Sequence, residues 1–412
     1  MLKVSPPLIT FTCRLHPVLT NGITAPGTDL PMSRSLASMA LLFTTVFSST
    51  SCTGPQESSS EMDGSASKPK LSPTEARPPT AWLVAAFETL DISVTDVQAA
   101  LDAGADVDAR DESGRTPLMI AAANGAAPEV IRLLVEAGAN VLDRDEEDNT
   151  ALIVACLGNT TPATLQALLD AGASLEAKNH YEETALLIAA TNRDLDVVEF
   201  LITSGADLGA RDEFGRTPLM HAVGNSTCSI QMVDKLIDAG SEVSAEDEDG
   251  KTAIVIAAAR TRSIEIITRL IDAGADVNAN RRNGKTPLME SSMYNRRPEI
   301  TKALLDAGAH IDYVDVLGTT PLMRAAKGNQ PEVVRLLIEA GADLNAMDVL
   351  VGTPLMYASI RDDEPTVITI LLDAGADPKL KNDLGRTALH HARENEHLQG
   401  TTEFEHLRTA AN

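Results

Sequence analysis

The sequence predicts an all-α solenoid of stacked helix–turn–helix units with projecting turns, and three observations support this fold class. A threonine recurs at positions 80, 116, 150, 184, 217, 252, 286, 320, 353 and 387, and a glycine recurs at 104, 138, 172, 205, 240, 274, 308, 341 and 375. Each glycine stands 12 positions before the next threonine, whereas the step from threonine to glycine varies between 21 and 24. Aromatic residues make up only 3% of the chain, so alanine, leucine and valine must form the core. Such a composition favours close-packed helices, and such a period is typical of repeat architectures.

Each unit is expected to begin with a short helix at its threonine. In the unit that starts at Thr116, the hydroxyl can cap the helix and Pro117 suits its first turn. A break at residues 124–129 precedes a second helix, because the apolar residues of 130–134 follow helical spacing. Gly138 can take the left-handed conformation that ends this helix, and a polar turn follows. Since turns of constant length stack on one another, extra residues fit only between the two helices.

These units resemble ankyrin repeats, which consist of a turn and two antiparallel helices with a T-P-L-H-x-A signature. The sequence TPLM occurs at Thr116, Thr217, Thr286, Thr320 and Thr353, with TALI, TALL, TAIV and TALH in register. The histidine of the signature is kept once, in TALH, and an apolar residue replaces it elsewhere. The resemblance implies an ankyrin-repeat solenoid over residues 80–411.

The first and last repeats differ from the others as the ends of an open stack should. The first repeat holds the single tryptophan, Trp82, with Phe87 nearby, and the second helix of the last repeat is mostly polar. A terminal repeat with a polar outer face keeps a solenoid soluble. We therefore expect residues 80–411 to form ten repeats capped at both ends.

Residues 32–51 resemble a bacterial lipoprotein signal peptide. Arg34 precedes an apolar run of 12 residues, 36–47, and small residues then lead to Cys52. The run is too short to cross a bilayer, which needs about 20 residues. The resemblance implies cleavage before Cys52 and lipidation of its thiol, although Ser49 stands where such signals usually place leucine.

Export signals lie at an N-terminus, so we expect synthesis to begin at Met32. Residues 1–31 are then an over-extended and disordered N-terminus, and the Gly/Ser/Pro-rich residues 52–79 are a flexible linker. Two alternatives stay open at this point: a cleaved secretory signal without lipid, and an uncleaved disordered tail.

Composition and cysteine usage argue against a nucleic-acid-binding protein and against a disulfide-bonded one. The formal net charge is −25, a field that repels nucleic acid and anionic lipid, so we expect no nucleic-acid partner. Cys156 and Cys228 stand two repeats apart, roughly 20 Å at 8–10 Å per packed helix layer. A disulfide needs Cα atoms within about 7 Å, so both are expected to be isolated thiols.

No catalytic, cofactor or metal site is predicted. The sequence has no GxSxG, HExxH or phosphate-binding glycine loop, and its histidines are scattered rather than set at ligand spacing. The acidic turns lack the spacing of a calcium-binding EF-hand loop. The sequence therefore indicates that the protein is not an enzyme and needs no cofactor.

The resemblance implies that a protein partner binds the concave side, which turn tips and first helices form. The two tip residues of each early turn are mostly acidic or polar, whereas the tips at 316–317 and 349–350 are aliphatic. Exposed together, these side chains would make an apolar patch of the kind that marks an interface. The alternative is that they cover one another. The predicted partner-binding residues are Tyr181, Phe214, Arg282, Val316, Leu317, Val349, Leu350 and Leu384.

Together these features predict a monomeric, non-catalytic protein-binding scaffold. If Met32 is the start, we expect it in the cell envelope, lipid-anchored or periplasmic, with no membrane contact other than the lipid; otherwise we expect it in the cytoplasm. One alternative is a cytoplasmic adaptor. Another is an inhibitor or immunity-type regulator, in which the acidic tips of repeats 2–6 cover a basic active site.

Overall fold

The computed structural model describes residues 93–192, 194–328, 330–350, 352–360 and 365–412, which belong to one compact unit of the chain. These residues form nineteen α-helices and no strand. The helices nearer the start of each repeat are α4 (Pro117–Ala123), α6 (Ala151–Leu157), α8 (Ala185–Asn192), α10 (Pro218–Gly224), α12 (Ala253–Arg260), α14 (Pro287–Tyr294), α16 (Pro321–Gly328), α18 (Pro354–Ile360) and α20 (Ala388–Glu394). Their second helices are α3 (Val94–Asp102), α5 (Pro128–Glu136), α7 (Pro162–Asp170), α9 (Leu195–Thr203), α11 (Ile230–Asp238), α13 (Ile264–Asp272), α15 (Pro298–Asp306), α17 (Pro331–Glu339), α19 (Thr366–Asp373) and α21 (Thr402–Ala411).

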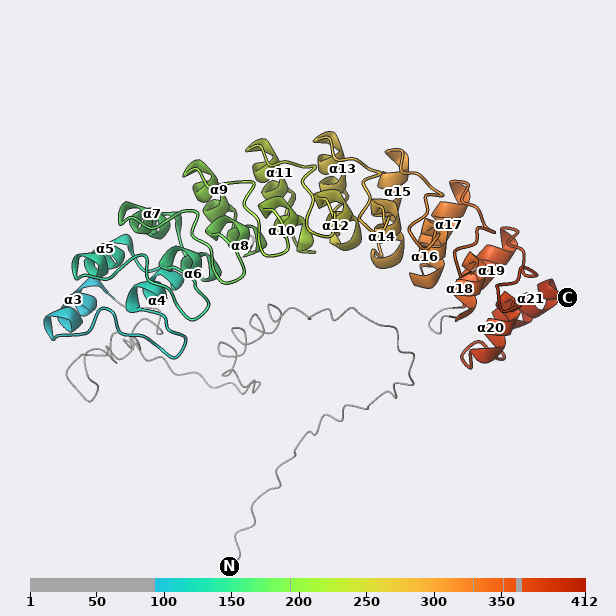
Figure 1. Cartoon of the computed structure of the whole chain (residues 1–412), viewed down its shortest axis with the longest axis horizontal. Coiled ribbons are helices and arrows are strands. Elements are labelled where there is room, and N and C mark those ends of the chain that lie inside the picture. The colour runs from blue at the N-terminus through green and yellow to red at the C-terminus, as the bar shows by residue number, and fades with distance from the viewer. Residues whose placement is uncertain (1–92, 193, 329, 351, 361–364) are drawn as a thin grey trace, which may run out of the picture. The chain divides into compact units, whose positions relative to one another are not determined.

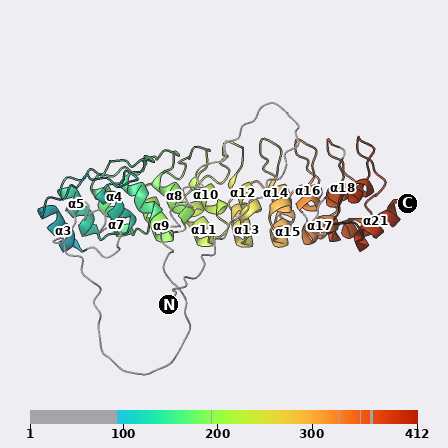
Figure 2. The same cartoon turned by 90° about the horizontal axis from the view of Figure 1, so that it is seen from below.

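The helix pairs follow one another in chain order as a single curved row (Figure 1). The first helices line the concave side of this row, and the second helices lie on the convex side (Figure 1). Figure 2 shows that the turns between repeats project on one side of the helices. The predicted all-α solenoid is confirmed.

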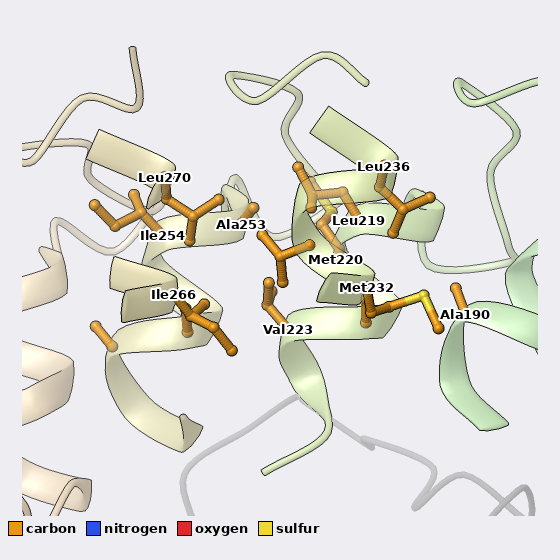
Figure 3. Packing of buried hydrophobic residues seen from close by; sticks show 14 of the residues in the cluster. Ala190, Leu219, Met220, Val223, Met232, Leu236, Ala253, Ile254, Ile266 and Leu270 are labelled. Atoms are coloured by element: carbon orange, nitrogen blue, oxygen red, sulfur yellow. The ribbon is translucent and has the colours of Figure 1, made fainter. Parts of the chain in front are cut away.

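The core runs continuously along the row. First helices pack against the first helices of neighbouring repeats, and their alanines permit this close approach; all six residues of 185–190 in α8 are buried. Second helices bury one apolar stripe, which in α13 consists of Ile266, Ile267 and Leu270. Figure 3 shows apolar side chains of α10 and α11 lying beside those of α12 and α13. No repeat encloses a core of its own, so each depends on its neighbours.

The threonines cap their helices only in part of the array. Where proline follows, the hydroxyl accepts a hydrogen bond from the backbone N–H three residues on, as at Thr286, 3.3 Å from the nitrogen of Met289. In three Thr-Ala repeats the hydroxyl is buried and has no hydrogen-bond partner among the described residues: Thr150, Thr184 and Thr252. The cap expected at Thr116 is confirmed, since the N–H of Met119 donates to its hydroxyl at 3.4 Å, and among these repeats such capping follows the Thr-Pro pair.

The second helices end as predicted. At Gly274 the backbone has φ = 92°, and the next N–H, of Ala275, reaches back to the carbonyl of Leu270 at 2.9 Å. Only glycine adopts this conformation without strain. The glycine period of the sequence therefore marks the ends of the second helices.

Several predictions concern residues outside the described part of the chain. These are the segments 1–31, 32–51 and 52–79, the lipidation of Cys52, and the cap formed around Trp82. At the other end, α21 buries only Leu407 among its ten residues. This exposure agrees with a polar outer face, and the capping function stays a prediction. No helix within the described residues has the length and apolarity needed to span a bilayer.

Candidate protein-binding surface

An aspartate or asparagine at the start of most turns holds the tip in shape. In the turn that carries Val316 and Leu317, Oδ1 of Asp315 accepts hydrogen bonds from the N–H groups of Leu317 and Thr319, both at 2.9 Å. Asp348 does the same for Leu350 at 3.0 Å and Gly352 at 2.7 Å. Because the carboxylate turns inward to satisfy these groups, the side chains at the tip are left facing solvent.

Successive tips are joined by backbone hydrogen bonds. The N–H of the first tip residue donates to the carbonyl of the second tip residue in the preceding repeat: Val316 to Asn283 at 3.1 Å and Val349 to Leu317 at 2.9 Å. The described residues contain seven such bonds, whose donors are Glu146, His180, Glu213, Glu248, Arg282, Val316 and Val349. The tips therefore form one connected edge, and neighbouring tip side chains lie side by side.

The aliphatic tips are exposed. We call Val316, Leu317, Val349, Leu350 and Leu384 the aliphatic tip row; their exposed fractions are 66%, 54%, 58%, 69% and 78%. Side chains that covered one another would not retain such exposure. The alternative of mutual cover is therefore wrong, and the row is an apolar surface in contact with water.

The other predicted residues divide into two groups. Arg282 is exposed, and its turn is joined to that of Val316 by the tip hydrogen bond, so it lies beside the aliphatic tip row. Tyr181 and Phe214 belong to turns further toward the N-terminus. Phe214 lies under the guanidinium of Arg216, 4.7 Å from its ring centroid, and half-buried Tyr181 meets His180 edge-on. The structure does not bring these two aromatics together with the row.

A layer of ionic and polar groups behind the aliphatic tips was missed by sequence reasoning. On α16, Arg324 lies 2.6 Å from the second carboxylate oxygen of Asp315, and both side chains are buried. On α18, the hydroxyl of Tyr357 donates to Asp348 in the same way. These partners occupy the fourth position after the repeat threonine, where the early repeats have an apolar residue: Ile120, Val154 and Ile188. Aligning the repeats position by position would have revealed this change.

The turn before the row is also unusual. Arg281 stands where the other turns have aspartate or asparagine, and it forms an ion pair with Glu290 of α14 at 3.2 Å. Lys285 lies close by: burial lowers its pKa, and the charge of Arg324 lowers it further, while Glu290 opposes the change. The ammonium of Lys285 is thus influenced by the charges of two arginines, Arg324 and Arg281, and of two carboxylates, Glu290 and Asp315.

The electrostatics of Asp315 follow from its two kinds of contact. Burial alone would raise the pKa of this carboxyl, but the hydrogen bond from Arg324 and those from the backbone of Thr319 and Leu317 outweigh it and lower the pKa. The carboxylate is therefore charged at neutral pH. It fixes Arg324 against the turn, and Arg324 in turn supports the aliphatic tip row from behind.

One arrangement away from the row resembles a catalytic relay. The imidazole of His221 bonds to Asp212 through Nε2 and to the hydroxyl of Thr191 through Nδ1, each at 2.9 Å. The same hydroxyl bonds to the carbonyl of Leu187 at 3.1 Å, and the side chains of His221 and Asp212 are almost fully buried. This network ties the turn of one repeat to the helices of two, which is a structural role.

No metal or thiol chemistry is evident in the described part of the chain. It contains no group of three or more His, Cys, Asp or Glu placed to hold a metal ion. Cys156 and Cys228 are not joined in a disulfide. Burial raises the pKa of the Cys156 thiol to about 12, so it is not a nucleophile at neutral pH.

Comparison with known families agrees with this architecture. A family model described as "Ankyrin repeats (3 copies)" matches residues 82–179, 139–212, 155–247, 186–281 and 254–348, and one described as "Ankyrin repeat" matches 352–383. No curated protein matches the chain. The family matches together cover more than half of the chain and coincide with the helix pairs and turns seen in the structure. The chain belongs to the ankyrin-repeat family.

Proposed function

We propose that this protein is a non-catalytic scaffold that binds a protein partner on its concave surface, with the aliphatic tip row as the main contact. One observation carries the proposal: five aliphatic side chains, each more than half exposed, lie on three successive turns, the first two of which are joined by a backbone hydrogen bond. A contiguous exposed apolar patch is a feature of interaction sites rather than of ordinary solvated turns. Rigid placement lowers the entropy lost when a partner binds.

The test replaces the row and leaves the helices intact. A variant with Val316, Leu317, Val349 and Leu350 all changed to serine should lose capture of the partner from its native host, as measured by quantitative mass spectrometry of affinity-purified material. The matched control is Leu142→Ser, an aliphatic side chain that is 53% exposed on a different turn. Circular dichroism should give the same helical content for all three proteins. Equal capture by the row variant would reject the proposal.

We further propose that the protein is exported and anchored through a lipid on Cys52, as the signal-like residues 32–51 suggest. The intact mass of the mature protein from a fractionated native host tests this directly. A membrane-bound species that starts at a lipidated Cys52 supports it. A species that retains residues 32–51 overturns it and favours the cytoplasmic adaptor.

A second candidate function rests on the acidic tips of the earlier repeats. Glu112, Glu146, Glu147, Glu213 and Glu248 are exposed along one edge, and they could cover the basic active site of an enzyme. Binding of this kind falls steeply as salt is raised, whereas binding to aliphatic tips changes little. Capture at low and high salt therefore separates the two functions.

A further inference from the structure

The surroundings of the aliphatic tip row differ in charge from the rest of the molecule. The chain has 34 Lys and Arg against 59 Asp and Glu, and the tips of repeats 2–6 are mostly acidic. In contrast, five cations lie on the turn that precedes the aliphatic tip row and on the first helix of the next repeat: Arg281, Arg282 and Lys285 on the turn, and Arg324 and Lys327 on α16.

Two of these cations are already neutralised within the protein. Arg281 pairs with Glu290 at 3.2 Å, and Arg324 pairs with Asp315 at 2.6 Å. These pairs engage Glu290 and Asp315, the two carboxylates whose charges oppose the lowering of the Lys285 pKa. The Nε atoms of both arginines remain buried without a hydrogen-bond partner among the described residues.

The other three cations have no carboxylate partner within the described part of the chain. Arg282 is exposed at the tip, and Lys285 is half-buried between the turn and α16. The ammonium of Lys327 lies 5.6 Å from the ring centroid of Tyr357, an interaction that orients the cation and leaves its charge unneutralised. Uncompensated positive charge beside an exposed apolar row makes the surface complementary to a ligand that is both apolar and acidic.

We propose that this surface binds a linear acidic segment of a partner protein, which places aliphatic or aromatic side chains on the aliphatic tip row and carboxylates against Arg282, Lys285 and Lys327. This inference rests on the proposed function and specifies the chemistry of the partner. Neighbouring repeats are about 8–10 Å apart, and an extended peptide advances about 3.3 Å per residue. The segment should therefore carry an apolar residue at about every third position, with acidic residues between them.

Selection from a phage-displayed library of random dodecapeptides on the purified full chain tests this prediction. The selected peptides should be rich in Asp and Glu and should repeat an apolar residue about every three positions. A chain that selects no peptide, or that selects neutral or basic peptides, overturns the inference.

The affinity of one selected peptide for variants of the chain, measured by fluorescence anisotropy, then tests whether the proposed residues contribute to binding. The double variant Arg282→Gln/Lys285→Gln should weaken binding by about two- to thirtyfold, since each exposed ion pair contributes about 0.2–1 kcal/mol. Leu317→Ser should weaken it as well. The matched control Arg335→Gln removes an exposed cation on the convex helix α17 and should leave the affinity unchanged.

The outcomes separate this inference from the proposed function. If the double variant binds the peptide as tightly as the unchanged chain, the acidic segment is rejected, whereas loss of partner capture in the serine variant of the row would still support a binding scaffold. If a single-stranded oligonucleotide competes as well as the peptide at equal charge, the surface recognises anions in general and the inference fails. Self-association that is lost in the row variant would identify a second copy as the ligand and would also overturn it.

Discussion

At the scale of single residues, the fourth position of the first helix decides which group lies behind the turn. The early repeats place apolar side chains there: Ile120, Val154 and Ile188. Arg324 instead forms a buried ion pair with Asp315. The side chain of Arg324 is 9% exposed and that of Asp315 is 1% exposed. Such a pair adds little net stability over an apolar pair of the same shape, but loss of one member leaves a buried charge without a partner.

Asp315→Asn should therefore lower the free energy of unfolding by about 3 kcal/mol at neutral pH, because Arg324 stays charged and buried. The effect should depend on pH. Because the folded protein holds the pKa of Asp315 below its ordinary value, the ionised carboxylate contributes its full stability above about pH 4. This contribution is lost as the pH falls through the lower folded pKa, so the two proteins should converge in acid. Urea unfolding, followed by circular dichroism across a pH series, measures the difference.

An exposed ion pair supplies the control for this experiment. Glu129 and Arg132 lie one turn apart on α5, and each side chain is more than half exposed. Glu129→Gln should leave stability almost unchanged at any pH, because water screens this exposed pair. An Asp315→Asn protein as stable as the unchanged chain at pH 7, or a difference that grows in acid, would contradict the role given to the pair.

At the scale of elements, the stacking of neighbouring repeats depends on how closely the ends of their first helices approach one another. After α6 the chain passes against the end of α4, and the N–H of Asn159 donates to the carbonyl of Ala123 at 2.8 Å. A Cβ atom built on Gly158 would stand 2.0 Å from that carbonyl oxygen. Glycine is therefore needed at this position for close approach.

Gly158→Ala should lower the free energy of unfolding by about 2 kcal/mol, because the two repeats must separate to admit the methyl group. Thermal and urea unfolding measure the loss. The matched control is Gly224→Ala at the end of α10, where a Cβ atom would meet only a methyl carbon of Ile256 at 3.7 Å. This control should cost nothing or gain about 0.5 kcal/mol. Similar values for both variants would show that the contact at Gly158 can relax.

At the scale of the whole molecule, stability comes from interfaces between neighbours. α18 packs against α20 and α19 packs against α21, so the last helix pair covers apolar residues such as Leu355, Ile368 and Leu371. When an internal repeat is removed from such a linear array, its two neighbours can pack against each other. When an end repeat is removed, the face that it covered is left exposed.

Deletion of residues 376–412 should therefore expose this apolar face and cause aggregation, detectable by light scattering during size-exclusion chromatography. Deletion of residues 252–285 is the control, because it removes 34 residues and places Thr286 where Thr252 stood. That protein should stay soluble and keep its helical content per residue. A soluble, folded product of the terminal deletion would mean that α20 and α21 do not protect the stack.

The sequence predicted the array because its determinants are local. The threonine and glycine periods fix where helices start and end, and Gly274 adopts the left-handed conformation expected for a helix terminus. Exposure of the aliphatic tip row could not be predicted, because the local sequence of the tips does not decide whether side chains of neighbouring turns cover one another. The pairing of Asp315 with Arg324 spans nine positions and joins a turn to a helix, so no short sequence motif predicts this contact.

The hydrogen bonds between successive tips have a mechanical consequence. They run from repeat to repeat, so bending or stretching of the solenoid changes their lengths directly. We therefore expect the edge that bears Val316 and Val349 to resist bending and stretching, because either would lengthen these bonds. A ligand whose anchoring side chains were spaced one residue too far apart would have to distort this hydrogen-bonded edge. The solenoid would then select partners by the spacing of their side chains, and ligands with a different spacing would bind more weakly.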